Sequence, residues 1–263
     1  MILAERDLHA HLQGERNQLH DSLKGFVSDR VLEAVFAIPR EDFVDPMQRF
    51  DAYENLAQSI PGYEGEASIS QPSVVAQMVE LLNPLPSDFV IEVGTATGYQ
   101  AAILGRLARH VVTLEIVPEL AEAATKRLHK LGVDNVTVMG IDANANMSLP
   151  EQADKLIITA AVFPLANLPL YNLVKEGGTI VVPVGGVVGK KNFCDLVRMQ
   201  KTKDGLKLER KIPGYSFVPL EGDGGWTACL AIIIEAHNKW FYEELTKATF
   251  PPAETPPGQT SSQ

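Results

Sequence analysis

The stretch Ile91-Glu-Val-Gly-Thr-Ala-Thr-Gly-Tyr-Gln100 decides the fold of this chain. It overlaps the apolar run 89–93, which predicts a buried strand, and it opens a helical pattern that continues to Arg109. Small residues between a strand and a helix let the backbone pass close to a ligand, and the helix N-terminus offers free amide groups. The spacing of Gly94 and Gly98 does not match the dinucleotide pattern G-x-G-x-x-G. A ligand-binding strand, loop and helix of another kind is therefore predicted.

Glu115 indicates what kind of ligand this loop is expected to bind. It stands at the end of the next predicted strand, 111–116, where a carboxylate can accept hydrogen bonds from both hydroxyls of a ribose. The glycine-containing loop and this acid together favour a nucleoside ligand. A tight turn that binds nothing is the alternative, because the motif alone does not specify a nucleoside.

Short apolar runs alternate with helical patterns through the middle of the chain. The predicted strands lie at 89–93, 111–116, 136–139, 155–159 and 179–184, and the helices at 99–109, 120–131 and 165–174. This alternation, with strands apolar throughout, predicts a doubly wound α/β fold with a mainly parallel, Rossmann-like sheet. Antiparallel strands that extend one edge are predicted at 196–199, 206–212, 216–219 and 228–234.

The chain is predicted to have four consecutive regions. They are an N-terminal helical region with a loop (1–88), the α/β core (89–189), strands and a helix that complete the domain (190–250), and a tail (251–263). The first region contains predicted helices at 29–36 and 72–82, joined by an irregular connection over 42–67. The tail is rich in Pro, Thr, Ser and Gln without periodic apolar positions, which predicts disorder.

The composition is that of a folded globular protein. Hydrophobic residues make up 45% of the 263 positions and charged residues 21%. The 33 acidic residues exceed the 23 Lys and Arg, for a net charge of −10, so a nucleic-acid partner is not expected. No apolar run approaches the ~20 residues that span a bilayer, and the N-terminus lacks the apolar core of a signal peptide. Cys194 and Cys229 form no C-x-x-C pair and suit reduced thiols, so a cytoplasmic protein without a membrane partner is expected.

Several stretches together resemble one known family. Glu92-Val-Gly-Thr-Ala-Thr-Gly-Tyr-Gln-Ala-Ala102 is similar to the first motif of class I S-adenosylmethionine-dependent methyltransferases. Ala67-Ser-Ile-Ser-Gln-Pro-Ser-Val-Val-Ala76 resembles the Thr-Ile-Ser-x-Pro substrate loop of the protein-L-isoaspartate O-methyltransferases, which generic methyltransferases lack. Phe217-Val-Pro-Leu220 also reads like that family. The resemblance covers roughly residues 28–222.

The resemblance implies a cofactor, a substrate and a set of site residues. The cofactor is S-adenosylmethionine, and the substrate is an isoaspartyl residue of a damaged protein or peptide. The implied cofactor-binding residues are Glu92, Gly94, Thr95, Ala96, Gly98, Glu115 at the ribose and Asp142 at the adenine amine. The implied substrate side consists of Ser70 at the methyl-transfer centre, Ser68 and Ile69 beside it, and Thr159, Ala160 and Ala161 where the isoaspartyl residue binds.

The chemistry of this reaction needs little beyond orientation. A sulfonium methyl is already an activated electrophile and a carboxylate is an anion at neutral pH, so transfer is an in-line displacement without a strong base. Ser70 is therefore expected to position the carboxylate and not to act as a nucleophile, and a role as a mere helix cap is the alternative. No metal is expected, since His9 and His11 lack a third ligand.

Three departures from the family pattern bear on function. Ala96 stands where glycine is usual, Ser68 replaces threonine, and Asp142 lies in Gly-Ile-Asp where Gly-Asp-Gly is usual. The leading hypothesis is a carboxyl O-methyltransferase that acts on isoaspartyl residues in protein repair, with a monomer favoured. A relative dedicated to one biosynthetic peptide and a noncatalytic methyltransferase-like binding module are the alternatives. A nicotinamide-dependent dehydrogenase is disfavoured by the glycine spacing.

Overall fold

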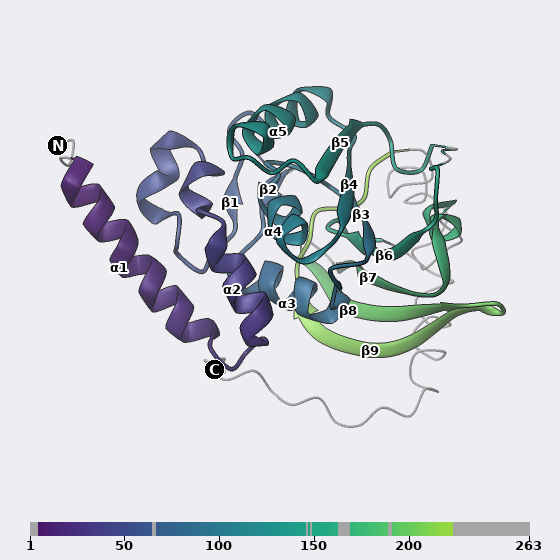
Figure 1. The fold of residues 1–263 in the computed structure, drawn as a ribbon. Helices are drawn as coiled ribbons and strands as arrows, with labels where there is room; N and C mark the ends of the chain where they lie inside the picture. The colour runs from purple at the N-terminus through teal and green to yellow at the C-terminus, as the bar shows by residue number, and fades with distance from the viewer. Residues whose placement is uncertain are drawn as a thin grey trace.

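The computed structural model describes residues 5–64, 67–145, 147, 149–162, 169–188 and 191–222. The strands of its main sheet are β3 (Phe89–Val93), β4 (His110–Glu115), β5 (Val136–Gly140), β6 (Ala153–Ile158), β7 (Val174–Val188), β8 (Lys191–Thr202) and β9 (Gly205–Tyr215). Within the described ranges this sheet has seven strands, in the order β5-β4-β3-β6-β7-β8-β9. The strands from β5 to β7 are parallel, and β8 and β9 add antiparallel pairs at one edge (Figure 1). The predicted doubly wound, mainly parallel α/β fold is confirmed.

Helices and a small second sheet precede and surround this main sheet. The α-helices are α1 (Glu5–Leu23), α2 (Asp29–Ala37), α3 (Pro72–Leu82), α4 (Tyr99–Leu107) and α5 (Pro118–Lys130), and the 3-10 helices are η1 (Arg40–Asp42), η2 (Pro46–Asp51) and η3 (Pro169–Leu173). The small sheet pairs β1 (Gln58–Ser59) with β2 (Ser68–Ile69). Figure 1 shows α1, α2, β1 and β2 grouped together on the same side of the main sheet. The N-terminal region therefore forms a layer of its own beside the core.

The main sheet is apolar on both faces, as parallel strands covered by other elements require. All residues of β3 are buried. Val90 belongs to a cluster with side chains of α1, α2, α3 and α4, whereas its neighbour Ile91 belongs to a second cluster on the opposite face. Because successive side chains of a strand point to opposite faces, this alternation fixes the register of β3 and the place where its loop begins.

Local sequence fixes the helix that follows the predicted substrate segment. Pro72 occupies the first turn of α3, where the missing amide hydrogen costs no intrahelical hydrogen bond. Asn83 ends the helix in the left-handed conformation with a φ of 48°. The burial of Val75, Met78 and Val79 anchors α3 in the core. The start of α3, and with it the position of the residues just before Pro72, is therefore well defined.

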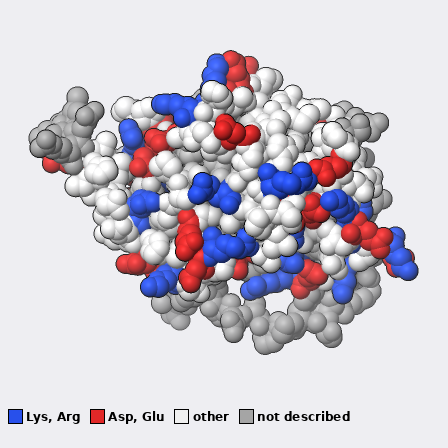
Figure 2. Space-filling model, in the orientation of Figure 1, with Lys and Arg blue, Asp and Glu red and all other residues white. Residues whose placement is uncertain are grey.

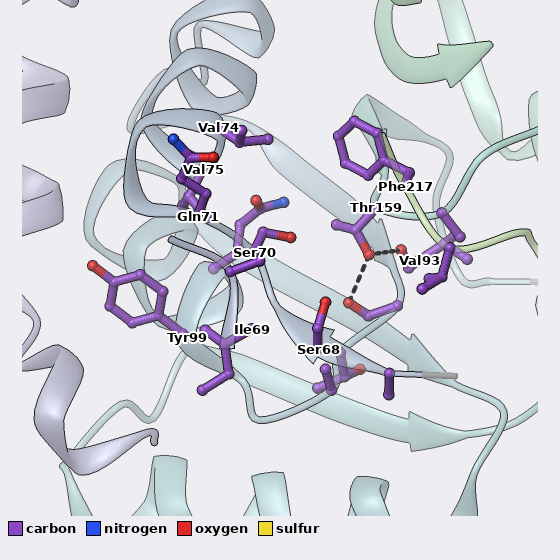
Figure 3. Close-up of a pocket in the computed structure, with 18 of the residues that line it drawn as sticks. Ser68, Ile69, Ser70, Gln71, Val74, Val75, Val93, Tyr99, Thr159 and Phe217 are labelled. Atoms are coloured by element: carbon purple, nitrogen blue, oxygen red, sulfur yellow. Dashed lines mark hydrogen bonds between the residues drawn. The ribbon is translucent and has the colours of Figure 1, made fainter. Parts of the chain in front are cut away.

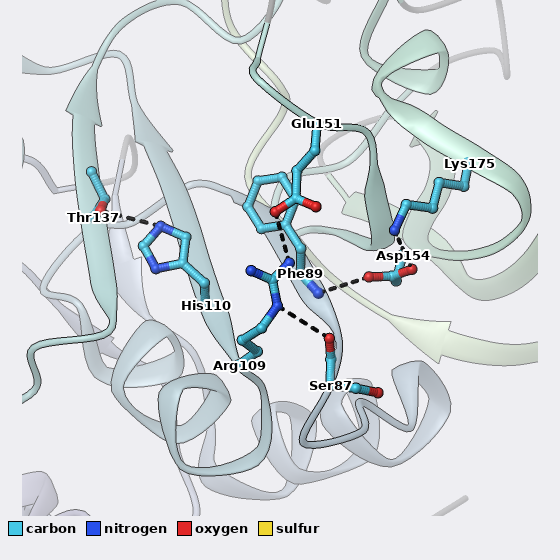
Figure 4. Close-up of polar contacts among 8 residues, drawn as sticks. All are labelled: Ser87, Phe89, Arg109, His110, Thr137, Glu151, Asp154 and Lys175. Atoms are coloured by element: carbon cyan, nitrogen blue, oxygen red, sulfur yellow. Dashed lines mark hydrogen bonds and ion pairs between the residues drawn. The ribbon is translucent and has the colours of Figure 1, made fainter.

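Charged side chains tie the amino ends of the parallel strands together (Figure 4). Arg109, just before β4, forms an ion pair of 2.7 Å with Glu151. Asp154 of β6 accepts hydrogen bonds from the Phe89 amide and from Lys175 Nζ of β7, both at 2.8 Å. These contacts lie at the edge opposite the carboxyl ends of the strands, so they concern stability and not the binding of a ligand.

The helix predicted at 165–174 is of the 3-10 type and ends one residue early in the part that the structure describes. There the chain forms the 3-10 helix η3 and then enters β7 at Val174. Val174 pairs with Ala153 of β6, and this sheet pairing takes precedence over the helical pattern. Residues 165–168 of the predicted helix lie outside the described residues.

The strand predicted at 216–219 is wrong. The sheet strand β9 ends at Tyr215, and residues 216–222, called the strap below, leave the sheet. The Ala161 amide donates to the Val218 carbonyl at 2.7 Å, and the Leu220 amide donates to the Ala161 carbonyl at 2.8 Å. Pro219 has no amide hydrogen for a sheet ladder, so the strap is held at Ala161 instead of along β8.

The connection predicted as irregular over 42–67 contains short regular elements. It includes η2 and β1, and Gln58 and Ser59 of β1 pair with Ile69 and Ser68 of β2. The predicted strand 228–234, the C-terminal helix and the tail 251–263 lie outside the described residues. The proposed boundary at 189/190 separates β7 from β8, which are neighbours in one sheet, so both regions share a core.

The surface carries charges of both signs. On the face shown in Figure 2, Lys and Arg side chains are interspersed with Asp and Glu. Among the helices of the described residues, none is both long and apolar enough to cross a bilayer.

Candidate active site

A cavity of about 1240 Å³ opens at the carboxyl ends of β3, β4 and β6. Its walls come from the loop after β3, the ends of β4 and β6, the segment from β2 into α3, and the stretch from the end of β9 through the strap. The carboxyl edge of a parallel sheet is where α/β proteins bind ligands. The volume exceeds the roughly 300–1,000 Å³ of ordinary small-molecule pockets, so there is room for more than one ligand.

Most of the predicted site residues face this cavity. Those that line it are Ser68, Ile69, Ser70, Gly94, Thr95, Ala96, Glu115, Asp142, Thr159 and Ala160. The predicted residues that do not line it are Glu92, Gly98 and Ala161. The loop expected to bind a nucleoside and the serine-containing segment therefore border the same space, although they are separated in the sequence.

Gly94 begins the loop after β3 and lies against Thr159 at the end of β6. The Thr159 hydroxyl lies 2.9 Å from the Val93 carbonyl oxygen and 3.0 Å from the Gly94 carbonyl oxygen, so these two acceptors share its single hydrogen (Figure 3). Gly94 has a φ of 93°, and a Cβ at this position would overlap the Thr159 hydroxyl. Only glycine combines this backbone conformation with so close an approach.

Ala96 holds an unusual conformation at the centre of the loop. Its φ is 49°, in the left-handed region that residues other than glycine adopt at a cost. The Ala96 amide donates a 2.7 Å hydrogen bond to Glu115 Oε2, while the Val117 amide donates to Glu115 Oε1 at 3.1 Å. The two amides fix the Glu115 carboxylate at the cavity wall, and Glu115 holds the loop in return.

Gly98 and Glu92 lie behind the loop. Gly98, at the N-cap position of α4, has a φ of 88°, and a Cβ there would lie 3.4 Å from the Leu128 side chain of α5. Glu92 is completely buried, and Thr113 Oγ1 donates to Glu92 Oε2 at 2.6 Å. Burial raises the pKa of Glu92 to about 8, while the hydrogen bond from Thr113 acts against this rise. Both residues support the loop without facing the cavity.

Asp142 and the strap meet at another wall of the cavity. The Asn144 amide donates to Asp142 Oδ1 at 2.8 Å, which fixes the side chain in a tight turn after β5. Asn144 Nδ2 in turn lies 3.4 Å from the Glu221 carbonyl oxygen of the strap. Gly222, with a φ of 102°, packs so close to the Asp142 carboxylate that a Cβ would overlap it. The shifted position of Asp142 in the sequence thus still brings its side chain to the cavity.

The segment Ser68–Ser70 crosses the opposite wall. Ser68 and Ile69 belong to β2, where the buried Ile69 side chain anchors the strand in the core. Ser70 follows just before α3, and in Figure 3 its side chain points to the side of the cavity where Thr159 and Phe217 lie. The predicted catalytic serine thus lies in the short connection between β2 and α3.

Ala160 and Ala161 differ in their position relative to the cavity. Ala160 lines the cavity next to Thr159, whereas Ala161 is buried and makes the two backbone hydrogen bonds that hold the strap. Ala161 therefore shapes the cavity through the strap.

Residues outside the predicted set of site residues also line the cavity. They are Ser22, Leu23 and Phe26 near the end of α1, Tyr63, Tyr99, Gln100, Ile116, Tyr215 and Phe217, among others. Tyr99 and Gln100 follow the glycine-containing loop directly, so their position next to a bound ligand was a signal in the sequence. Phe26 and Tyr63 belong to segments without a motif, and only the packing of the N-terminal layer brings them to the site.

These residues fit S-adenosylmethionine. Glu115 offers a fixed carboxylate for ribose hydroxyls, Asp142 offers an acceptor for the adenine amine, and the backbone at Gly94 allows a close approach. No lysine or arginine lines the cavity among the described residues, while acids do, which suits a cationic sulfonium. The mainly parallel sheet and this loop define a class I S-adenosylmethionine-dependent methyltransferase.

Comparison with known proteins gives the family. The family model described as protein-L-isoaspartate(D-aspartate) O-methyltransferase matches residues 15–225, a wider range than the 28–222 of the sequence motifs. A protein-L-isoaspartate O-methyltransferase of Dictyoglomus turgidum is 40% identical over 215 residues, which cover 81% of this chain and 93% of that protein. One from Parvibaculum lavamentivorans is 43% identical over 199 residues, covering 75% and 86% respectively. The chain belongs to the protein-L-isoaspartate O-methyltransferase family.

Solved structures agree with this assignment. A protein-L-isoaspartate O-methyltransferase structure superposes with a TM-score of 0.67 at 26% identity, over 79% of this chain and 66% of that chain. A putative enzyme of the same name from Plasmodium falciparum, in complex with S-adenosyl-L-homocysteine, gives a TM-score of 0.64 at 18% identity, over 78% and 98%. The second likeness concerns the fold alone.

Proposed function

We propose that this chain transfers the methyl group of S-adenosylmethionine to the carboxylate of L-isoaspartyl residues in damaged proteins. As a member of its family, the chain is an S-adenosylmethionine-dependent O-methyltransferase of protein repair. The observation that carries the assignment to this cavity is that the loop after β3 and Glu115 border the same space as Ser68–Ser70. A nucleoside-type site and a site for a peptide carboxylate are thereby next to each other.

The cofactor side of the site consists of the loop 94–98, Glu115 and Asp142. When bound, S-adenosylmethionine supplies a methyl group that its sulfonium has already activated. Glu115, held by the Ala96 and Val117 amides, accepts hydrogen bonds from the ribose hydroxyls. Asp142 accepts from the adenine amine. These roles orient the cofactor without any proton transfer.

The substrate side has to orient a carboxylate and exclude water. The isoaspartyl carboxylate is ionised at neutral pH, so it attacks without a general base. The Ser70 hydroxyl donates to one carboxylate oxygen and leaves the other free to face the methyl group. Ser68, Thr159 and Ala160 border the space for the rest of the isoaspartyl residue. The product is a methyl ester, which closes to a succinimide by loss of methanol.

The decisive experiment measures transfer of labelled methyl groups to a synthetic isoaspartyl peptide. A twin peptide with a normal aspartyl residue is the substrate control. Ser70→Ala tests the positioning role, and Ser87→Ala is the matched control, because Ser87 is exposed at the amino edge of the sheet. We expect base-labile label on the isoaspartyl peptide alone, and a loss of about tenfold to a hundredfold in kcat/KM for Ser70→Ala only.

Other results would change the assignment in defined ways. Label on both peptides would contradict selectivity for isoaspartyl residues. No label on either peptide, although S-adenosylmethionine binds, would favour an enzyme dedicated to one particular peptide. Equal activity of Ser70→Ala and the unsubstituted chain would remove the positioning role of Ser70.

A cytoplasmic location and a monomeric state are further proposals, which rest on the composition and the cysteine content. Sedimentation of the purified chain at micromolar concentration tests the monomer, and a sedimentation coefficient of a dimer would contradict it.

A further inference from the structure

Glu92 is connected to the cavity by two threonine side chains. It pairs in register with Thr113 of β4, and Thr95 lies above Thr113 in the loop. The distance from Thr113 Oγ1 to Glu92 Oε2 is 2.6 Å, and that from Thr95 Oγ1 to Thr113 Oγ1 is 2.7 Å. Glu92 and Thr113 are completely buried, whereas Thr95 lines the cavity. A continuous chain of hydrogen bonds therefore runs from a buried carboxyl group to the cavity wall.

The charge of Glu92 determines which group donates and which accepts in each of these hydrogen bonds. A threonine hydroxyl has one hydrogen and can donate only one hydrogen bond. When Glu92 is ionised, Thr113 donates to it, and Thr95 must then donate to Thr113. The hydrogen of Thr95 is thereby used inside the protein, and its oxygen keeps lone pairs for the cavity. A protonated Glu92 allows the reverse direction, in which Thr95 offers a hydrogen to the cavity.

The amino-acid part of S-adenosylmethionine needs an acceptor for its ammonium group. The acidic side chains that line the cavity, among the described residues, are Glu115, Asp142 and Glu221. Glu115 and Asp142 are assigned above to the ribose hydroxyls and the adenine amine, and Glu221 belongs to the strap. The loop 94–98 itself contains no acid. The acceptors that the loop itself offers to an ammonium group are hydroxyl and carbonyl oxygens.

We propose that Glu92 serves the cofactor through Thr113 and Thr95, by orienting both hydroxyls so that the Thr95 oxygen accepts a hydrogen bond from the cofactor ammonium group. Thr95 touches the cofactor in this arrangement, while Glu92 and Thr113 are positioning residues. The inference rests on the proposed function, because it requires S-adenosylmethionine as the ligand.

The surroundings of Glu92 agree with a charge that depends on the ligand. Burial is the main reason that its pKa is raised to about 8 in the absence of a ligand, and the nearby Glu115 adds to the rise. Thr113 on β4 and Gln100 on α4 face the carboxyl group and favour its ionised form. A cationic ammonium group next to Thr95, at the other end of these hydrogen bonds, favours the ionised form of Glu92 further. Ligand binding and the acceptor state of Thr95 therefore support each other.

The test compares two ligands that share adenine, ribose and thioether but differ in the amino-acid part. S-adenosylhomocysteine carries the ammonium group, and 5′-methylthioadenosine lacks it. Calorimetry measures both dissociation constants for the full chain and for Thr113→Val, which keeps the side-chain shape and removes the hydroxyl. We expect the Kd of S-adenosylhomocysteine to rise about tenfold and that of methylthioadenosine to change less than about twofold. Thr113→Ser should restore the original affinity.

Two further variants make the test specific. Thr179→Val is the matched control, because Thr179 is also a buried threonine of the sheet but bonds Lys155 Nζ, at 3.1 Å, near the amino ends of the strands. It should leave both dissociation constants unchanged. Thr95→Val interrupts the series of hydrogen bonds at the cavity and should give the same ligand-selective loss of affinity. This variant keeps the test valid if Thr113→Val does not fold.

The possible outcomes separate the two proposals. An equal loss for both ligands in Thr113→Val and Thr95→Val, or no loss for either, would overturn the chain of hydroxyls as a positioning device. Failure of the unsubstituted protein to bind S-adenosylhomocysteine would refute the proposed function and this inference with it. A selective loss of S-adenosylhomocysteine binding, with rescue by Thr113→Ser, supports both.

Discussion

The hydroxyl of Thr159 lies 3.0 Å from the carbonyl oxygen of Gly94, at a point where Gly94 has no room for a side chain. The contact joins the end of β6 to the loop after β3, and so links the two walls of the cavity that belong to neighbouring strands. The sequence resemblance places Thr159 on the substrate side. In the structure its hydroxyl also braces the loop proposed to bind the cofactor.

Thr159→Val should therefore weaken cofactor binding. Valine keeps the shape and loses the hydroxyl whose hydrogen the Val93 and Gly94 carbonyls share, so the loop loses this contact. We expect the Kd of S-adenosylhomocysteine, measured by calorimetry, to rise about threefold to tenfold. Thr159→Ser keeps the donor and should stay near the original value. Equal weakening in both variants would show that the methyl group, and not the hydroxyl, is what matters.

Ala96→Gly should stabilise the folded chain. The φ of 49° at Ala96 is strained for alanine and free for glycine, although glycine also gains entropy in the unfolded chain. The expected net effect is a gain of up to about 1 kcal/mol in the free energy of unfolding, measured by urea titration. Ala123→Gly, at an exposed position of α5, is the control and should lose about 1 kcal/mol. A loss of similar size in both variants would argue against strain at Ala96.

Glu92→Gln should change how stability depends on pH. The pKa of Glu92 is raised to about 8 in the folded chain, so between the unfolded value of 4.5 and about 8 the folded state holds an additional proton. This contribution to stability is present below the unfolded pKa and is lost as the pH rises through the folded pKa. Urea titrations from about pH 5 to about pH 9 should show a decline in the free energy of unfolding of the unsubstituted protein. The glutamine variant should lack this decline. Parallel pH profiles would contradict a buried, proton-binding Glu92.

Asp154→Asn should act at the opposite end of the pH range. Partial burial acts to raise the pKa of Asp154, but the hydrogen bonds from Lys175 and the Phe89 amide outweigh it and hold this pKa below its usual range. The resulting stability is present above the unfolded pKa and is lost as the pH falls through the folded pKa. Because both partners are partly exposed, we expect no more than about 1 kcal/mol at neutral pH, and a smaller difference near about pH 3. Acid titrations of the unfolding midpoint measure it, and a constant difference down to low pH would contradict the ion pair as its source.

The sequence predicts the part of the fold that depends on local patterns. The buried strand 89–93, the small residues after it and the helix from Tyr99 follow one another directly, so periodicity and glycine spacing suffice. The helix from Pro72 is likewise predictable, because a proline at its start and a left-handed Asn83 at its end are local signals. The predicted site residues on these elements, such as Gly94 and Ser70, accordingly line the cavity.

Elements that depend on pairing between distant segments were predicted less well. The predicted helix 165–174 ends before Val174, because Ala153 of β6 offers a sheet partner there. The apolar stretch 216–219 reads like a strand, but the hydrogen bonds of Ala161 turn it into part of the strap. The connection of Glu92 to the cavity runs through Thr113 of the neighbouring strand, and residues 91–100 alone do not encode that contact.

The strap borders the cavity continuously from residue 216 to residue 221. At Phe217 it lies beside Thr159 (Figure 3), and at Glu221 its carbonyl oxygen contacts Asn144 next to Asp142. One short piece of backbone thus forms part of the wall proposed for the peptide and part of the wall proposed for the cofactor. Any adjustment of this backbone that improves the fit of one ligand changes the free energy with which the other binds. Such linkage is reciprocal, so the factor by which cofactor strengthens peptide binding equals the factor by which peptide strengthens cofactor binding.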